Sequence, residues 1–154
     1  MNSHPTDQAC LFCKIIAGQI PSHKLYEDDQ VYSFLDIGPL SPGHALVIPK
    51  GHYLTLDQVP DEVGAAIGRV LPKLSKAIAQ ATGAASWNIL QNNGTPAGQV
   101  VGHVHFHIIP RPDPASSARD GDLPGNGLPF GWPAGEVDHE AAAVLAQTIM
   151  QQRP

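Results

Sequence analysis

The pattern of apolar and polar positions predicts short strands interrupted by one long helix. Between Asp61 and Thr82 the apolar residues recur at three- and four-residue steps, the period of an amphipathic helix, and Asp61 and Glu62 lie in its first turn, where acidic side chains are favoured. Segments rich in β-branched and aromatic residues between turn-forming residues are typical of strands. The predicted strands are Lys24 to Glu27, Val31 to Asp36, His44 to Ile48, Trp87 to Asn92 and His103 to Ile109.

Two further helices are predicted near the ends of the chain. One runs from Cys10 to Ala17 and stops before Gly18, and the other runs from about Val137 to Gln151. Only one long helix separates the two groups of strands, which favours an antiparallel α+β sheet over an alternating parallel one. The segment Arg111 to Gly135 is dense in proline and glycine and is predicted to be irregular.

One predicted strand carries three histidines at alternate positions. Side chains alternate between the two faces of a strand, so these imidazoles should share one face while the residues between them face the core. Alternate residues lie about 6.6 Å apart along a strand, a spacing that suits a metal site or, alternatively, a nucleophile with a neighbouring donor acting on one phosphate. The row is His103, His105 and His107, with Val104, Phe106 and Ile108 between them.

Length and charge narrow the classes of partner. A chain of 154 residues fits one domain with a sizeable core. Its net charge is -5, from 9 Lys+Arg and 14 Asp+Glu, and no basic cluster is present to bind nucleic acid or an anionic membrane surface. No signal peptide and no run of 18 apolar residues occurs, so we expect a cytoplasmic protein.

The two cysteines, Cys10 and Cys13, are spaced C-x-x-C. In a reducing compartment this spacing favours half of a metal site or a redox pair over a structural disulfide. A metal ion would need further ligands, since structural zinc takes four in tetrahedral geometry. Two free buried cysteines are the alternative.

The segment from His103 to Ile109 resembles the histidine-triad (HIT) motif, in which histidines alternate with apolar residues. The similarity extends to CLFCKIIAGQIPS, FLDIGPLSPGHALVIPK and NNGTPAGQ, in that order, and covers about Cys10 to Arg111. The resemblance implies a HIT domain over 10–111 after a flexible segment 1–9. Residues 112–154 would add the irregular tail and a C-terminal helix packed on the same domain. It also implies an α+β fold on an antiparallel sheet, a homodimer, and hydrolysis of purine nucleotides.

The same resemblance implies catalytic roles for three histidines. His105 would be the nucleophile that takes the nucleoside monophosphate. His107 would contact the non-bridging phosphate oxygens, and His44 would complete the histidine cluster.

Nucleotide contacts are implied at further positions. Asp36 would bind the ribose hydroxyls, and Asn92 and Gln99 would contact the phosphate and the leaving-group side. Local turn chemistry is the alternative for all three. The apolar base pocket would consist of Phe12, Ile15, Phe34 and Ile37.

The resemblance to bacterial HIT and Hint-like proteins with this C-x-x-C pair implies a structural zinc ion and no organic cofactor. The ion would be bound by Cys10, Cys13, His52 and His103. One position departs from the Hint branch, which usually has serine directly after the glutamine, whereas this chain has Val100. That serine donates to the leaving group, which Val100 cannot do. The resemblance as a whole implies cleavage of nucleoside phosphoramidates or related nucleotides. The alternatives are dinucleoside polyphosphate hydrolysis, as in Fhit-like proteins, or a nucleotide-binding regulatory module with little turnover.

Overall fold

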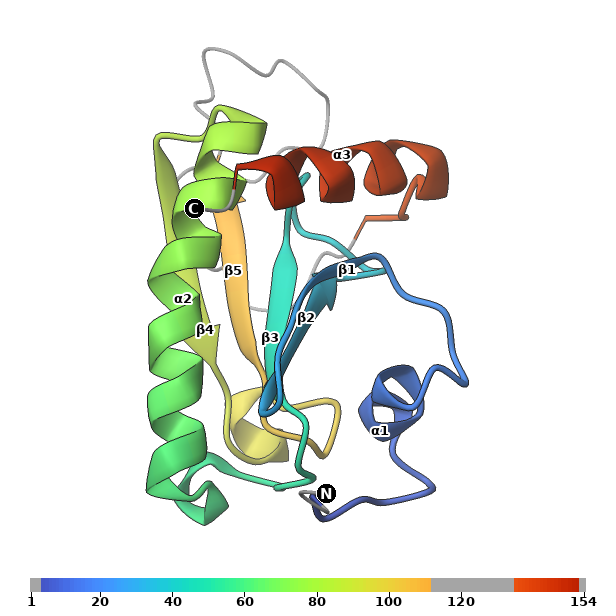
Figure 1. The fold of residues 1–154 in the computed structure, drawn as a ribbon, viewed down its shortest axis with the longest axis vertical. Helices are drawn as coiled ribbons and strands as arrows, with labels where there is room; N and C mark the ends of the chain where they lie inside the picture. The colour runs from blue at the N-terminus through green and yellow to red at the C-terminus, as the bar shows by residue number, and fades with distance from the viewer. Residues whose placement is uncertain (1–3, 112–134, 153–154) are drawn as a thin grey trace.

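The computed structural model describes residues 4–111 and 135–152. It consists of one five-stranded sheet with helices on both sides (Figure 1), in the order β1-β2-β3-β5-β4 with every pair antiparallel. This confirms the predicted α+β class. The strands are β1 (Lys24–Glu27), β2 (Val31–Leu35), β3 (Ala45–Pro49), β4 (Ser86–Gln91) and β5 (Phe106–Arg111). The helices are α1 (Leu11–Ile16), α2 (Asp61–Thr82) and α3 (His139–Gln151), with short 3-10 turns at Leu56–Gln58 and Thr95–Ala97.

The two faces of the sheet pack against different helices. Ala45 lies opposite Ile108, and both belong to the main core beneath α2 and α3. Phe34 lies opposite Leu46, which in turn lies opposite His107, and Phe34 and Leu46 pack with α1 on the other face. Directly paired residues point to the same face, so His107 projects on the α1 side.

The helices agree with the sequence pattern. α2 has the predicted bounds and ends at Gly83, whose φ of 70° is the left-handed conformation that glycine favours at a helix C-terminus. α3 begins two residues later than predicted, because Asp138 caps it by accepting hydrogen bonds from the Glu140 and Ala141 amides. Its buried face packs on the main core with Ala142, Ala146 and Ile149. Within the described ranges, no helix has the length and apolar character needed to span a membrane.

The histidine strand is shorter than predicted, because β5 begins at Phe106 and not at His103. Phe106 lies opposite Val47 in β3, so extending the pairing by two residues would place Val104 opposite Pro49. Proline has no N–H to donate, and the ladder stops there. The Val104 amide instead donates to the Tyr53 carbonyl at 2.8 Å.

The N-terminal segment 1–9, predicted to be flexible, is hydrogen-bonded to later residues in its described part. Within its described part, the Pro5 carbonyl accepts a hydrogen bond from the His52 amide at 2.7 Å, and the Asp7 carbonyl accepts one from the Cys10 amide at 3.1 Å. These bonds hold the segment against the start of α1. The predicted irregular stretch lies outside the described residues, apart from its two ends at Arg111 and Gly135.

Candidate active site and metal centre

A pocket of about 410 Å³ lies on the α1 side of the sheet. One end is apolar, with Phe12 and Ile15 from α1 and Phe34 and Leu46 from the sheet. The polar residues that line it are Ser22, Asp36, Asn92, His105 and His107. The pocket therefore combines an apolar surface suited to an aromatic base with hydrogen-bonding groups suited to ribose and phosphate.

His105 is held in one tautomer by the backbone. Its Nδ1 lies 2.6 Å from the His103 carbonyl oxygen. A carbonyl can only accept, so Nδ1 carries the proton and Nε2 keeps a free lone pair. The ring is buried, and burial lowers the pKa of His105 below its ordinary value of 6.5. At neutral pH, Nε2 is an unprotonated nitrogen able to act as a nucleophile.

His107 is held in the opposite tautomer by a chain of two hydrogen bonds. The Leu40 amide donates to His44 Nδ1 at 3.0 Å, so His44 carries its proton on Nε2. That Nε2 lies 2.9 Å from His107 Nδ1, and 3.5 Å from Asp36 Oδ2. The shorter contact makes His107 Nδ1 the acceptor, which leaves the proton of His107 on Nε2. Burial is the main cause that lowers the pKa of both His44 and His107 to about 3. Repulsion by neighbouring positive charges, from Arg111 and His105 on His44 and from His105 and His44 on His107, lowers it further.

A nucleophile and a donor thus stand side by side. The ring centroids of His105 and His107 are 4.9 Å apart in a T-shaped arrangement. One ring offers a lone pair and its neighbour an N–H, the pair of functions needed to attack phosphorus and bind its oxygens.

Asp36 and Asn92, predicted to contact the nucleotide, both line the pocket. Asp36 accepts a hydrogen bond from the Gly38 amide through Oδ1, and its side chain is 17% exposed. Asn92 also donates to the Gly98 carbonyl at 3.4 Å, so it helps to shape the loop before the triad. Both predicted readings of Asn92, a loop contact and a pocket contact, fit this position.

Gln99 is placed differently from the prediction. It does not line the pocket, and its amide is engaged inside the protein. The oxygen accepts from the Gly94 amide, and the nitrogen donates to the carbonyls of Leu54 and Val101. Its side chain secures the loop by joining these three backbone groups.

All four residues predicted to form the base pocket line this pocket. Phe12, Ile15 and Phe34 are buried and line the apolar end. Ile37 lines the pocket but is 62% exposed, so it stands at the mouth beside Val100, which is 93% exposed.

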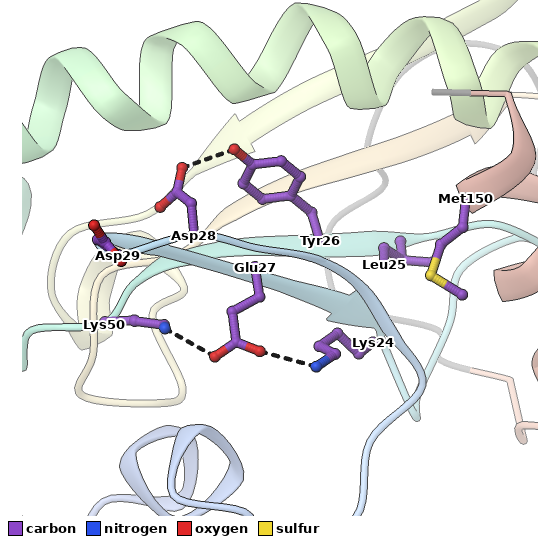
Figure 2. A pocket seen from close by; sticks show the side chains of 8 residues that line it. All are labelled: Lys24, Leu25, Tyr26, Glu27, Asp28, Asp29, Lys50 and Met150. Carbon is purple, nitrogen blue, oxygen red and sulfur yellow. Dashed lines mark hydrogen bonds and ion pairs between the residues drawn. The ribbon is translucent and has the colours of Figure 1, made fainter. Parts of the chain in front are cut away.

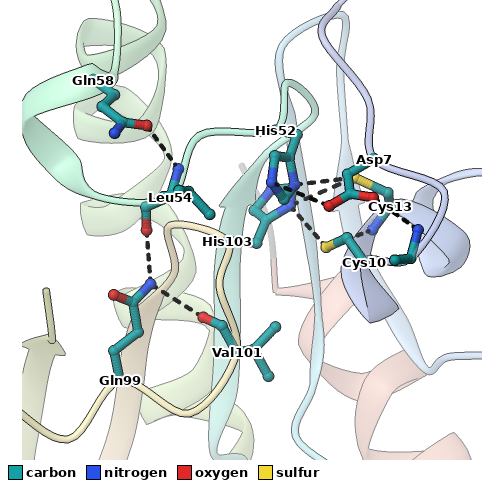
Figure 3. Close-up of polar contacts among 10 residues, drawn as sticks. Asp7, Cys10, Cys13, His52, Leu54, Gln58, Gln99, Val101 and His103 are labelled. Atoms are coloured by element: carbon teal, nitrogen blue, oxygen red, sulfur yellow. Dashed lines mark hydrogen bonds and ion pairs between the residues drawn. The ribbon is translucent and has the colours of Figure 1, made fainter. Parts of the chain in front are cut away.

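The four predicted metal ligands converge (Figure 3), with ligand atoms all within 4.8 Å of one another. The sulfur of Cys10 lies 3.5 Å from His103 Nδ1, and that of Cys13 lies 3.5 Å from His52 Nδ1 and 3.7 Å from His103 Nδ1. Around a tetrahedral zinc ion, bonds of about 2.3 Å to sulfur and about 2.05 Å to nitrogen place those atoms about 3.5 Å apart. His103 Nε2 donates to the Pro49 carbonyl at 2.9 Å, which leaves Nδ1 unprotonated for a metal. The residues fit zinc.

A second group of possible ligands does not fit a metal. Atoms of Asp36, His44 and His107 also lie within 4.8 Å of one another. However, the Leu40 amide occupies His44 Nδ1, so His44 Nε2 carries a proton and has no lone pair for an ion. Of the two groups found among the described residues, the cysteine-containing one is therefore the one that could hold a metal.

A separate groove lies along the sheet edge at β1 (Figure 2). Three of its charged side chains are paired, since Glu27 binds Lys50 at 2.8 Å and Lys24 at 2.9 Å. The Tyr26 hydroxyl donates to Asp28 at 2.7 Å, and Asp28 also caps the turn into β2. These contacts give the groove a structural role.

Several site residues were not predicted. Ile20, Pro21 and Ser22 line the pocket just after α1, and Leu11 and Val101 complete its walls. The segment Ile20 to Ser22 lies within the CLFCKIIAGQIPS similarity, which could have pointed to it. The Leu40 amide and the Pro49 carbonyl, which orient His44 and His103, could not be found from the sequence. Amides and carbonyls belong to the backbone, so residue type does not reveal which of them contact the site.

Comparisons with known proteins agree with this geometry. A model of the HIT domain family matches residues 17–113. An adenosine 5'-monophosphoramidase of Saccharomyces cerevisiae is 44% identical over 144 residues, covering 94% of this chain and 82% of the yeast protein. An adenylylsulfatase of Arabidopsis thaliana is 56% identical over 102 residues, covering 66% of this chain, and this chain spans only 52% of the plant protein. A Zn-bound histidine triad family protein from Mycobacterium smegmatis superposes with a TM-score of 0.73 at 32% identity, covering 93% of this chain and 94% of that one.

The hydrogen bonds predict the tautomers of the site directly. Long-range proton–nitrogen correlation spectra should show His105 protonated on Nδ1 and His107 and His44 protonated on Nε2. An imidazole is neutral above its pKa, so the protonation states of His44 and His107, with pKa values of about 3, should not change between about pH 7 and about pH 5. A His107 ring protonated on both nitrogens at about pH 6 would contradict this arrangement.

Proposed function

This chain belongs to the HIT domain family, and on that premise we propose that it hydrolyses purine nucleoside phosphoramidates through a nucleotidyl-histidine intermediate. The observation that carries the proposal is the juxtaposition, in one pocket, of the unprotonated His105 Nε2 and the protonated His107 Nε2. The first is a nucleophile and the second a hydrogen-bond donor to phosphate. The named activity of the yeast relative, an adenosine 5'-monophosphoramidase, supports this substrate class.

The reaction has two steps. In the first, His105 Nε2 forms a bond to the α-phosphorus while the phosphorus–nitrogen bond of the substrate breaks, and the amine takes up a proton from the solvent as it leaves. In the second, the oxygen of water forms a bond to phosphorus, the bond to His105 breaks, and the proton that the water loses returns to the solvent, which releases the nucleoside monophosphate. His107 donates to a non-bridging oxygen in both steps, and His44 positions His107 through their 2.9 Å contact.

The remaining pocket residues would bind the nucleoside. The base would lie against Phe12, Ile15 and Phe34, with Ile37 at the mouth. Asp36 would accept hydrogen bonds from the ribose hydroxyls, because a carboxylate only accepts. Asn92 would contribute its amide to the phosphate end. Gln99 would act indirectly, by securing the loop that carries Val100.

The pocket favours an amine over a polyphosphate as the leaving group. Of the described residues that line it, none is lysine or arginine, so no cation is present to neutralise a chain of phosphates. Val100 at the mouth offers no donor either. Dinucleoside polyphosphate hydrolysis remains the second candidate within the same chemistry, and comparing kcat/KM for the two substrates separates them.

The nucleophile assignment predicts the effect of one substitution. With adenosine phosphoramidate as substrate, His105→Ala should lower kcat at least about a thousandfold, because the covalent route is lost. Wild-type protein quenched with acid should carry a nucleotide adduct that the variant lacks. The exposed His23→Ala is the matched control and should behave as wild type.

Other outcomes would decide against the proposal. Wild-type turnover by His105→Ala would remove the assigned nucleophile. Tight binding of AMP by a wild-type protein that does not hydrolyse adenosine phosphoramidate would indicate a nucleotide-binding regulatory module instead.

We also propose that Cys10, Cys13, His52 and His103 bind one structural zinc ion. The sulfur–nitrogen distances and the free Nδ1 of His103 support it, as does the Zn-bound relative from Mycobacterium smegmatis. All four ligands come from the protein, so the site has no open position for substrate. Unoxidised thiols of this kind suit a reducing compartment, and we expect the protein in the cytoplasm.

Metal analysis tests the zinc site. Protein purified without added metal should contain about one equivalent of zinc, and Cys10→Ser should contain less than about a tenth of one. His107→Ala is the matched control, because it belongs to the group that does not fit a metal, and it should keep the full equivalent. A wild-type content below about a tenth of an equivalent would exclude a structural zinc site.

We further propose that the chain forms a homodimer through β4. This strand is an edge of the sheet, and its Trp87 and Ile89 are 42% and 46% exposed. They line an apolar groove with Leu71 and Pro72 of α2. An exposed apolar edge strand is a template for pairing, and a second copy of β4 would cover it.

Light scattering during gel filtration checks the dimer. Wild-type protein should show twice the chain mass of 16.3 kDa, whereas Ile89→Lys should shift toward the monomer because it places a charge in the apolar contact. Val144→Lys, which alters an apolar residue 63% exposed on α3, is the matched control and should remain dimeric. A monomeric wild-type protein would exclude this interface.

A further inference from the structure

We propose that the metal site and the nucleotide pocket are coupled through α1, so that each ligand raises the affinity of the protein for the other. This inference rests on the proposed function and on the proposed zinc site. It adds a role that neither requires, namely that metal occupancy sets nucleotide affinity.

α1 is shared by both sites. Cys10 is its N-cap residue and Cys13 lies in its first turn, so one end of the helix carries both thiols. Leu11, Phe12 and Ile15 of the same helix line the pocket. Phe12 and Ile15 are three residues apart and therefore lie on one face of the helix. A single element thus supplies two metal ligands and one wall of the pocket.

α1 is too short to hold its position alone. It has six residues, and isolated helices shorter than about 12 residues are marginal in water. It is attached to the sheet by the buried side chains of Phe12 and Ile15, and at its other end by the thiols, which face His52 and His103. A metal ion would join the helix to the sheet side through four bonds. Loss of the ion would leave the apolar contacts and the weaker thiol–imidazole hydrogen bonds.

Phe12 connects the two sites directly. Its ring meets His103, a proposed metal ligand, edge-on with centroids 5.8 Å apart. The same ring meets His105, the proposed nucleophile, at 5.3 Å and nearly perpendicular, and Phe34 of the pocket at 5.5 Å. A movement of α1 therefore changes the surroundings of the nucleophile as well as the base-binding wall.

A second link runs through the backbone. The carbonyl of His103 accepts the hydrogen bond that holds the tautomer of His105. The imidazole of His103 is itself fixed between the thiols and the Pro49 carbonyl. Metal bound to His103 thus restrains the residue that orients the nucleophile.

Coupling of this kind is reciprocal. If zinc raises the affinity for a nucleotide by some factor, the nucleotide must raise the affinity for zinc by the same factor. We expect a factor of about ten, within the range usual for sites joined by one small element. The coupling acts on binding, so it is measurable without turnover.

The experiment measures both halves of this cycle. The dissociation constant of AMP is determined by calorimetry for the zinc-loaded protein and for protein stripped with a chelator, and zinc affinity is determined by chelator competition with and without saturating AMP. The ratio of AMP affinities with and without zinc, and the ratio of zinc affinities with and without AMP, should be equal and about ten. Circular dichroism of the stripped protein checks that α2 and the sheet remain folded.

Two variants locate the coupling. Phe12→Leu keeps the metal ligands but loses the ring that meets His103 and His105, so both ratios should fall toward one while zinc content stays at one equivalent. Val100→Ala alters a residue at the mouth of the pocket that is not part of α1, and it should leave both ratios as in the wild type.

The outcomes separate this inference from the proposed function. Equal AMP affinities with and without zinc, in a protein that still hydrolyses the phosphoramidate, would overturn the coupling alone. Undiminished ratios in Phe12→Leu would overturn the route through α1. Failure of the zinc-loaded protein to bind AMP would overturn the coupling and the proposed function together.

Discussion

The chemistry of this site depends on one backbone hydrogen bond, from the Leu40 amide to His44 Nδ1. This donor obliges His44 to carry its proton on Nε2, and His44 in turn obliges His107 to present an N–H to the pocket. Leu40 lies in the loop between β2 and β3, which is itself fixed where the Ser41 hydroxyl donates to the Pro110 carbonyl. A loop rich in proline and glycine thus sets the proton positions of a buried histidine pair.

Hydrogen bonds likewise place three identical side chains along one segment in two tautomers. His103 gives its Nε2 proton to the Pro49 carbonyl and keeps Nδ1 for a metal. His105 gives its Nδ1 proton to the His103 carbonyl and keeps Nε2 as a nucleophile, while His107 accepts at Nδ1 and donates from Nε2. The hydrogen-bond partner of each ring, a backbone carbonyl for His103 and His105 and the His44 side chain for His107, therefore determines which nitrogen keeps a lone pair.

The sequence predicts those features of the fold and the site that depend on local patterns. α2 and the shared face of the histidines followed from local periodicity, because each pattern repeats within a few residues. The start of β5 depends on Pro49, which is 54 residues before His103 in the chain, and the position of Gln99 depends on the Leu54 carbonyl. Such contacts join distant backbone groups that every residue carries, so composition and spacing hold no signal for them.

The basicity of the nucleophile reflects a balance between burial and charge. Burial lowers the pKa of His105, whereas its bond to the His103 carbonyl and the nearby Asp36 carboxylate raise it. A general rule of nucleophilic catalysis is that the attacking nitrogen must be unprotonated yet as basic as possible. Burial meets the first requirement and Asp36 supports the second. A carboxylate placed to accept hydrogen bonds from ribose would therefore also tune the atom that attacks phosphorus, and substrate binding would act on the same charge.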